Sequence, residues 1–133
     1  EKIAQDGLSV IIPLHPRTSQ SLRNSKVTIQ NSKLRCISPV GYLDMLMLEQ
    51  NAKAILTDSG GMQKEAYFFG VPCVTMRTET EWMETVNAGW NIVVGANQEK
   101  IVAVVRSFKT NKPRPGLYGD GMAAEKIIYH LTA

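Results

Sequence analysis

The chain has 133 residues, of which 44% are hydrophobic and 20% charged, a composition typical of one globular domain with its own core. Its net charge of +3 is too small to indicate nucleic-acid binding, and its apolar runs are far shorter than the ~20 residues of a membrane-spanning helix. The first residues lack the pattern of a secretory signal. We therefore expect a cytoplasmic protein that binds neither nucleic acid nor membrane.

Short apolar runs alternate with helical patterns along the chain, after an opening at residues 1–7 that has the pattern of the end of a helix. Runs typical of strands buried on both faces cover residues 8–14, 34–40, 53–59, 72–77 and 90–95. Helical patterns cover residues 17–24, 42–51, 61–69, 80–88, 98–109 and 121–132. This alternation predicts a single α/β domain over residues 1–133, a doubly wound, Rossmann-like parallel sheet with helices on both sides.

The cysteine and charge patterns give two further expectations. Cys36 and Cys73 each lie inside an apolar run, which predicts buried free thiols, and no cysteine or histidine cluster suggests a metal or other cofactor. Between Asp6 and Asp44 the chain carries only basic charges. These are Arg17, Arg23, Lys26, Lys33 and Arg35. They form either a solvated surface or a positive rim that attracts a phosphorylated ligand.

The segment AILTDSGGMQKEAYFFGVPCV, residues 54–74, places a Ser-Gly-Gly sequence directly after a predicted strand. If Ser59 is the N-cap, the free N–H groups at the start of the next helix are open to an anion, because Gly60 and Gly61 have no Cβ. A phosphate or diphosphate at Ser59, Gly60 and Gly61 is one interpretation, with Glu65 accepting hydrogen bonds from ribose hydroxyls. A capped helix with a solvated Glu65 is the other.

Other nucleotide signatures are absent from the sequence. The pattern G-x-G-x-x-G does not occur, nor does G-x-x-x-x-G-K-[ST], which argues against dinucleotide binding and P-loop chemistry.

Four segments resemble the non-hydrolysing UDP-N-acetylglucosamine 2-epimerases: PLHPRT, the long block GYLDMLMLEQNAKAILTDSGGMQKEAYFFGVPCVTMR, TETEWMETVNAGWNIVVG and LYGDGMAAEKI. The resemblance implies the C-terminal part of a two-domain, B-type glycosyltransferase-like architecture. On that basis we expect the N-terminal domain, and the start of the C-terminal domain with its Gly-His-Arg segment, to lie outside these residues.

What the resemblance implies for the site agrees with the interpretation of the glycine pair. It places the diphosphate at Ser59, Gly60 and Gly61 and the ribose on Glu65. It places the uracil near Val40 and Met45, although Met45 by itself has the pattern of a core residue.

The sequence departs from the family pattern after Arg77. Trp82 and Met83 stand where many members have the Arg-Pro whose arginine contacts the diphosphate. This segment resembles a branch of the family whose members include enzymes that act on other UDP-N-acetylated sugars, some of them diacetamido uronic acids. Arg77 fits either the electrostatics of the cleft or an ion pair. Thr78 and Glu81 also fit a capping box for the helix that follows.

The implied reaction is inversion at C2 of the sugar, interconverting UDP-GlcNAc and UDP-ManNAc by elimination and re-addition of UDP, for cell-envelope polysaccharides. The catalytic acid and base are expected outside this chain, so the chain alone should be inactive. His15 is either a loop histidine or part of a second, regulatory UDP-sugar site. A glycosyltransferase domain and a non-catalytic UDP-sugar sensor remain alternatives, and we expect a homodimer.

Overall fold

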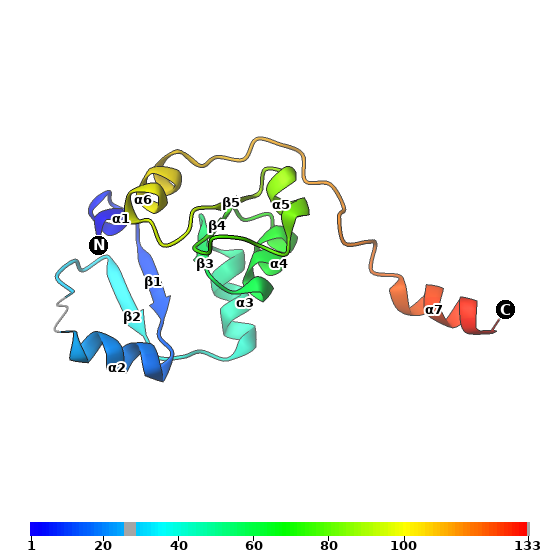
Figure 1. Ribbon diagram of the computed structural model, residues 1–133. Coiled ribbons are helices and arrows are strands. Elements are labelled where there is room, and N and C mark those ends of the chain that lie inside the picture. Colours follow the sequence, from blue (N-terminus) through cyan, green and yellow to red (C-terminus); the bar gives the residue numbers. More distant parts are fainter. Residues whose placement is uncertain (26–28, 133) are drawn as a thin grey trace.

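The computed structural model describes residues 1–25 and 29–132 (Figure 1). Lys26 of the basic stretch lies outside these ranges. Within them the strands are β1 (Val10–Pro13), β2 (Leu34–Ile37), β3 (Ile55–Thr57), β4 (Cys73–Thr75) and β5 (Asn91–Val93). Each lies inside a run predicted to be a strand, and every pairing is parallel, as predicted.

The strands form two sheets instead of one. β1 pairs with β2 from Val10↔Leu34 to Pro13↔Ile37, and β3, β4 and β5 pair in sequence order. Among the described residues no strand joins β1 to β3, so each of these strands keeps one unpaired edge. The predicted α/β class is confirmed, whereas the prediction of one continuous sheet is wrong for the described residues.

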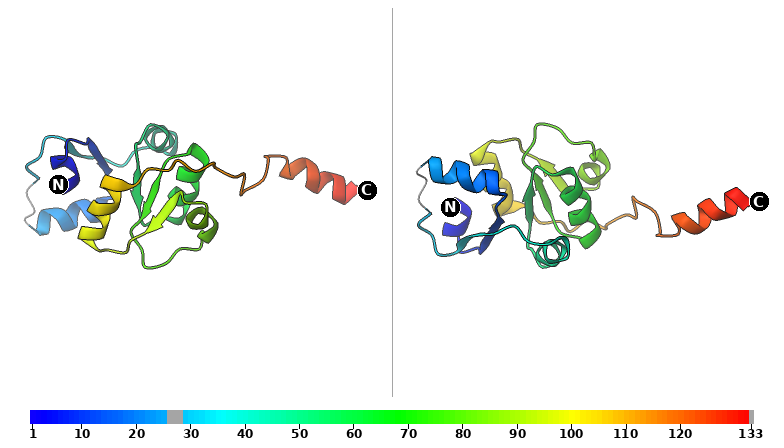
Figure 2. Two further views of the ribbon diagram at one scale, coloured as in Figure 1. Left: turned by 90° about the horizontal axis from the view of Figure 1, so that it is seen from above. Right: turned by 90° about the horizontal axis from the view of Figure 1, so that it is seen from below.

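The helices follow the predicted patterns: α2 and α4 begin one residue earlier than predicted, whereas the others are shorter at one or both ends. In the described ranges they are α1 (Lys2–Gln5), α2 (Pro16–Asn24), α3 (Tyr42–Gln50), α4 (Gly60–Phe69), α5 (Met83–Asn87), α6 (Gln98–Ser107) and α7 (Ala123–Thr132). Helix α4 contacts β3 and β4, and α6 contacts β4. Figure 2 shows α4 and α6 on opposite sides of the three-stranded sheet, the doubly wound arrangement.

The core lies between the three-stranded sheet and α4. Ile55, Ala66, Val71 and Cys73 form its buried apolar cluster. Strands β1 and β2 have no fully buried residue in their described burial patterns, so the prediction that all runs are buried on both faces is wrong for these two. For the same reason Cys36, on β2, is exposed, and only Cys73 is a buried thiol as predicted.

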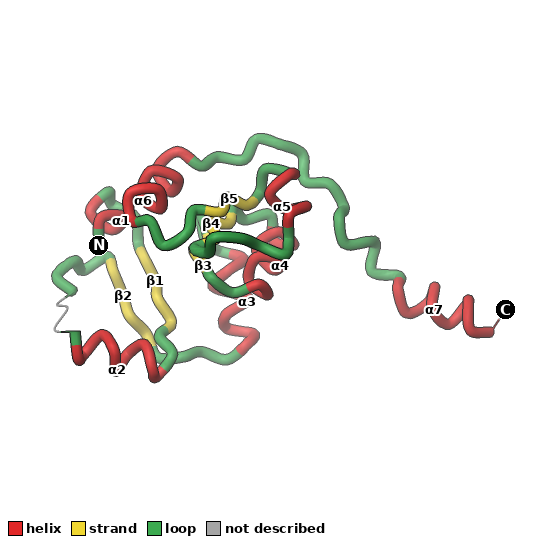
Figure 3. Tube along the Cα trace, viewed as in Figure 1, coloured by secondary structure: helices red, strands yellow, loops and turns green. Residues whose placement is uncertain are grey.

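The C-terminal segment leaves this core after α6. Arg114 donates from Nη1 to the carbonyl oxygens of Tyr67 and Phe68, the last turn of α4, and the Tyr67 hydroxyl donates to the carbonyl oxygen of Pro115. Beyond this anchor, α7 projects away from the rest of the chain (Figure 3), and all its described residues are exposed. Among the described helices, none is long and apolar enough to cross a membrane.

Candidate functional site

The carboxyl ends of β3 and β4 place two polar segments side by side. After β3, Ser59 is the N-cap of α4, as predicted: its Oγ accepts a hydrogen bond from the Met62 N–H at 3.5 Å. The Ser59 N–H in turn donates to Thr57 Oγ1 at 3.0 Å, which fixes the turn. An ideal Cβ added to Gly61 would meet only the Ser59 hydroxyl, at 3.8 Å, so the start of α4 is open on this side.

Glu81 covers the other side of this helix start. An ideal Cβ on Gly60 would lie 2.5 Å from Glu81 Oε1, so the carboxylate lies directly against Gly60. Arg77 donates to Glu81 Oε2 at 2.9 Å, which makes Arg77 an ion-pair residue at the edge of the site. The predicted capping box is wrong, because α5 begins only at Met83 and Glu81 pairs with Arg77 instead.

Trp82 brings an unpaired donor to the same place. Its Nε1 is buried without an acceptor among the described residues, and it lies 3.4 Å from the ideal Cβ position of Gly60. The Lys64 ammonium lies over the Trp82 ring, 4.5 Å from its centroid, and over the Tyr118 ring at 4.8 Å. A cation so placed is attracted by the ring faces. The site thus combines free N–H groups, an indole N–H and two cations.

A buried polar network holds the Arg77–Trp82 segment in place. Gln63, fully buried on α4, accepts at Oε1 from Thr80 (2.6 Å) and from Asn91 Nδ2 (3.1 Å). The Asn91 side chain also bonds Thr75 (2.7 Å) and Thr85 (3.2 Å). Because buried polar groups are costly unless paired, this network links α4, β4, β5 and α5 in one arrangement.

Glu65 on α4 has a hydrogen-bond partner on the neighbouring helix α3. Its Oε1 accepts a hydrogen bond from the Tyr42 hydroxyl at 3.1 Å, and this contact raises the pKa of Tyr42. Glu49, buried on α3, has a pKa raised to about 7, first by burial and then by the negative charge of Glu65. Two carboxyl groups and a phenol therefore meet where α3 packs on α4.

Val40 and Met45 are half-buried, one directly before α3 and one in its second turn. Val40 follows β2 and Met45 lies on the helix that contacts α4. The described contacts neither join them to the glycine pair nor separate them from it, so their role stays a prediction.

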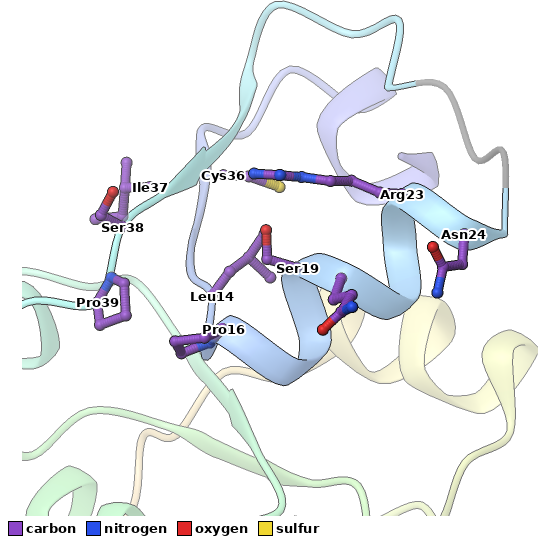
Figure 4. A pocket seen from close by; sticks show the side chains of 10 residues that line it. Leu14, Pro16, Ser19, Arg23, Asn24, Cys36, Ile37, Ser38 and Pro39 are labelled. Atoms are coloured by element: carbon purple, nitrogen blue, oxygen red, sulfur yellow. The ribbon is translucent and has the colours of Figure 1, made fainter.

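His15 caps α2, where its Nδ1 accepts a hydrogen bond from the Arg17 N–H at 3.3 Å. Beside it, α2 and the end of β2 enclose a hollow of about 730 Å³ (Figure 4). Arg23 extends across this hollow toward Cys36. Leu14 and Pro16 line it, whereas His15 itself is not among the described lining residues.

Sequence reasoning missed Tyr42, Glu49, Gln63 and Lys64. The one available signal was spacing: Tyr42 and Glu49 are seven residues apart, which places them on the same helix face. Gln63 and Lys64 carried no such signal, because their partners lie 17 to 54 residues further along the chain.

A family model described as UDP-N-acetylglucosamine 2-epimerase matches residues 1–132. The chain belongs to this family. It is 51% identical over 123 residues to the UDP-N-acetylglucosamine 2-epimerase homolog of Methanococcus maripaludis, which covers 90% of this chain and 34% of that protein. It is 46% identical over 125 residues to the UDP-2,3-diacetamido-2,3-dideoxy-D-glucuronate 2-epimerase of Pseudomonas aeruginosa, covering 92% of this chain and 34% of that protein.

Among solved structures, the chain resembles the UDP-GlcNAc 2-epimerase of Methanocaldococcus jannaschii in complex with UDP-GlcNAc and UDP. The TM-score is 0.81 with 43% identity, over 98% of this chain and 37% of that one. The family membership and the Rossmann-like fold expected from the sequence are confirmed. The chain spans about a third of the length of these family members.

Proposed function

We propose that the chain is the UDP-binding part of a UDP-N-acetylglucosamine 2-epimerase, and that it holds the diphosphate at Ser59, Gly60 and Gly61. The observation that carries the proposal is the open N-terminus of α4, capped by Ser59 and free of side chains at Gly61. Free N–H groups and the helix dipole favour an anion at such a position. The UDP and UDP-GlcNAc complex of the Methanocaldococcus jannaschii relative supports this ligand class.

The neighbouring side chains complete the proposed nucleotide site. Trp82 Nε1, buried without an acceptor among the described residues, donates to the diphosphate, and Arg77 turns from Glu81 to the phosphate oxygens. Glu65 receives the ribose hydroxyls, while Val40 and Met45 contact the uracil. Glu81 must move from Gly60 when the diphosphate arrives, because two anions in one place repel.

The chemistry that this chain contributes is stabilisation of the departing diphosphate. The reaction inverts C2 of the sugar by eliminating UDP and adding it back, which interconverts UDP-GlcNAc and UDP-ManNAc. N–H donors fixed at the start of α4 act on the charge that develops on the leaving group and need little rearrangement. The groups that move the C2 proton belong to parts of the protein outside these residues.

Two sugars are candidates for the substrate, and the first is the N-acetylglucosamine named above. The 46% identity to the Pseudomonas aeruginosa enzyme named for a diacetamido glucuronate supports a uronic acid substrate as the second. Because the proposed contacts of this chain reach the nucleotide, both sugars are compatible with it. A cytoplasmic role in cell-envelope polysaccharide synthesis completes the proposal.

We also propose that copies of the chain associate. Several apolar side chains of α7 lie exposed, Ile127 at 59%, Ile128 at 61% and Leu131 at 80%. Contiguous apolar surface of this kind favours association. Sedimentation velocity of the 133-residue chain should show a concentration-dependent dimer, and a Leu131→Glu variant that sediments like the parent would contradict this contact.

A direct test of the nucleotide site compares two glycine substitutions by isothermal titration with UDP. Gly61→Ala adds one methyl group where only the Ser59 hydroxyl is near, so the fold is retained but the anion's approach is blocked. We expect at least a tenfold loss of affinity. Gly116→Ala, where a Cβ would meet nothing within 4 Å, is the matched control and should bind like the parent. Equal binding by Gly61→Ala would place the diphosphate elsewhere.

A further inference from the structure

Helix α3 buries an acidic residue while apolar residues of the same helix are exposed. Its single fully buried residue among those described is Glu49, which is 3% exposed, whereas Leu43 and Met47 on the same helix are 75% and 59% exposed. Burying a carboxylate is costly unless it is paired or protonated, so its position calls for an explanation. Burial of apolar surface does not explain the position of Glu49, because the apolar side chains of Leu43 and Met47 on the same helix are exposed.

Glu49 is buried without a hydrogen-bond donor from the part of the chain that the structure describes. Neither of its carboxylate oxygens has a hydrogen-bond partner among the described residues. The titratable groups that interact with Glu49 are Glu65 on α4, Tyr42 two helical turns earlier on α3, and the Cys73 thiol on β4. Tyr42 already gives its hydrogen to Glu65 Oε1. Cys73 stays a thiol, since burial raises its pKa to about 11.

Glu49 and Glu65 lie close enough to interact where α3 packs on α4, and two neighbouring carboxyl groups repel each other least when they share one proton. Glu49 is the more deeply buried of the two, so it is the group that keeps the proton, and a protonated carboxyl is a donor. Glu65 would then receive one hydrogen bond from Tyr42 and one from Glu49, both from the α3 side. These two bonds hold its carboxylate in one orientation at the second turn of α4.

We propose that Glu49 is a positioning residue of the nucleotide site: in its protonated form it donates a hydrogen bond to Glu65 and orients that carboxylate toward the ribose. The inference rests on the proposed function, in which Glu65 receives the ribose hydroxyls. Ionisation of Glu49 turns the donor into a second negative charge beside Glu65. The nucleotide then loses an oriented hydrogen-bond acceptor, the Glu65 carboxylate, and binds at a site that carries one more negative charge.

The first experiment measures UDP affinity of the 133-residue chain by isothermal titration from pH 6.5 to 8.5. The parent should lose about five- to tenfold in affinity over this range, the size of one lost hydrogen bond. Glu49→Gln keeps a donor that does not titrate, so its affinity should exceed that of Glu49→Leu about fivefold and change little with pH beyond the titration of UDP itself. Asp44→Asn, an exposed acid on the same helix, is the control and should keep the parent profile.

The second experiment separates the shared proton from nucleotide binding. Carbon-13 NMR of the side-chain carboxyls, without ligand, should show Glu49 titrating near neutral pH in the parent and at lower pH in Glu65→Gln. If UDP binds and Glu49→Gln has the parent's pH profile, the positioning role is overturned while the proposed function stands.

If UDP fails to bind the folded parent, the proposed function is overturned, and with it the ribose role of the pair. In that case the carboxyl titration still decides whether Glu49 and Glu65 share a proton. A Glu49 carboxyl that titrates at its ordinary acidic pH would overturn the inference at its base.

Discussion

The two sheets of this chain are built from similar apolar runs but are buried very differently. Strand β4 is buried along its whole length and β3 and β5 in part, whereas β1 and β2 have no fully buried residue. Helix α4 buries Gln63, Ala66 and Tyr67 against its sheet, while α2 buries no residue. Edge strand β3 has a single neighbouring strand, as β1 and β2 do, yet it is largely buried because α4 covers it, so the covering helix decides whether such an apolar run enters the core.

The difference extends to polar groups. The three-stranded unit, β3–β5 with α4 and α5, contains the network centred on Gln63 and Asn91. The two-stranded unit, β1 and β2 with α1 and α2, is joined to α6 by an exposed bidentate ion pair, in which Arg106 donates to Asp6, at the end of α1, at 2.7 and 2.8 Å. The first unit is therefore held by a buried polar network, whereas the ion pair of the second lies at the surface, and four predictions test this contrast.

The largest effect should come from the network. Gln63→Ala removes the buried acceptor of Thr80 and one of the two acceptors of Asn91, and it opens a cavity, so we expect a loss of about 3 kcal/mol in the free energy of unfolding. Cys36→Ala, at an exposed position on β2, should lose less than about 0.5 kcal/mol. Urea unfolding measures both. Similar losses in the two variants would remove the distinction between the units.

The next effect is the pH dependence of stability from Glu49. Its pKa is raised in the folded chain from 4.5 to about 7, so its contribution to stability is full below pH 4.5 and is lost as pH rises toward 7. The size is about 3 kcal/mol. Subtracting the unfolding free energy of Glu49→Gln from that of the parent at each pH isolates this slope. A difference that is flat between pH 4.5 and 7.5 would contradict a buried, protonated Glu49.

A smaller effect is expected on UDP affinity, and it shows which of the two units binds the diphosphate. Arg77 pairs with Glu81, which lies against the start of α4 in the three-stranded unit, and Arg23 extends across the hollow beside β2. We expect Arg77→Gln to weaken UDP binding about fivefold, because one charge-assisted contact is lost. Arg23→Gln should change the affinity by less than twofold. The reverse outcome in isothermal titration would move the nucleotide to the hollow between α2 and β2.

The smallest effect concerns acid and the two-stranded unit. The hydrogen bond from Arg106 lowers the pKa of Asp6, so this contact stabilises the chain above the ordinary pKa of 3.8 and is lost as pH falls below it. Hydrogen exchange read by mass spectrometry should show peptides of α1 and β1 losing protection between pH 5 and pH 3, after correction for the intrinsic rate. Asp6→Asn should abolish that change, and uniform loss in both units would argue against two separately held regions.

Several features followed from local sequence. The strand runs, the parallel pairing and the Ser59 cap were predictable because each depends on neighbouring residues: apolar periodicity, alternation of strand and helix, and a serine before two glycines. The family resemblance of the long block from Gly41 to Arg77 is confirmed by the family model. About ten neighbouring positions were enough for each strand run and for the cap, whereas the parallel pairing and the family resemblance needed the order of segments over a longer stretch.

Other features depended on residues far apart in the chain. Cys36 lies in a run as apolar as that of Cys73 and is nevertheless exposed, because α2, the helix beside β2, buries no residue. Glu81 was expected to cap a helix and instead pairs with Arg77 over Gly60. Glu49 resembles a solvated acid in the sequence, and only the packing of α3 on α4 buries it beside Glu65. Local pattern decides which segments become strands and helices, whereas burial and charge pairing depend on what covers them, and that is settled only when distant segments meet.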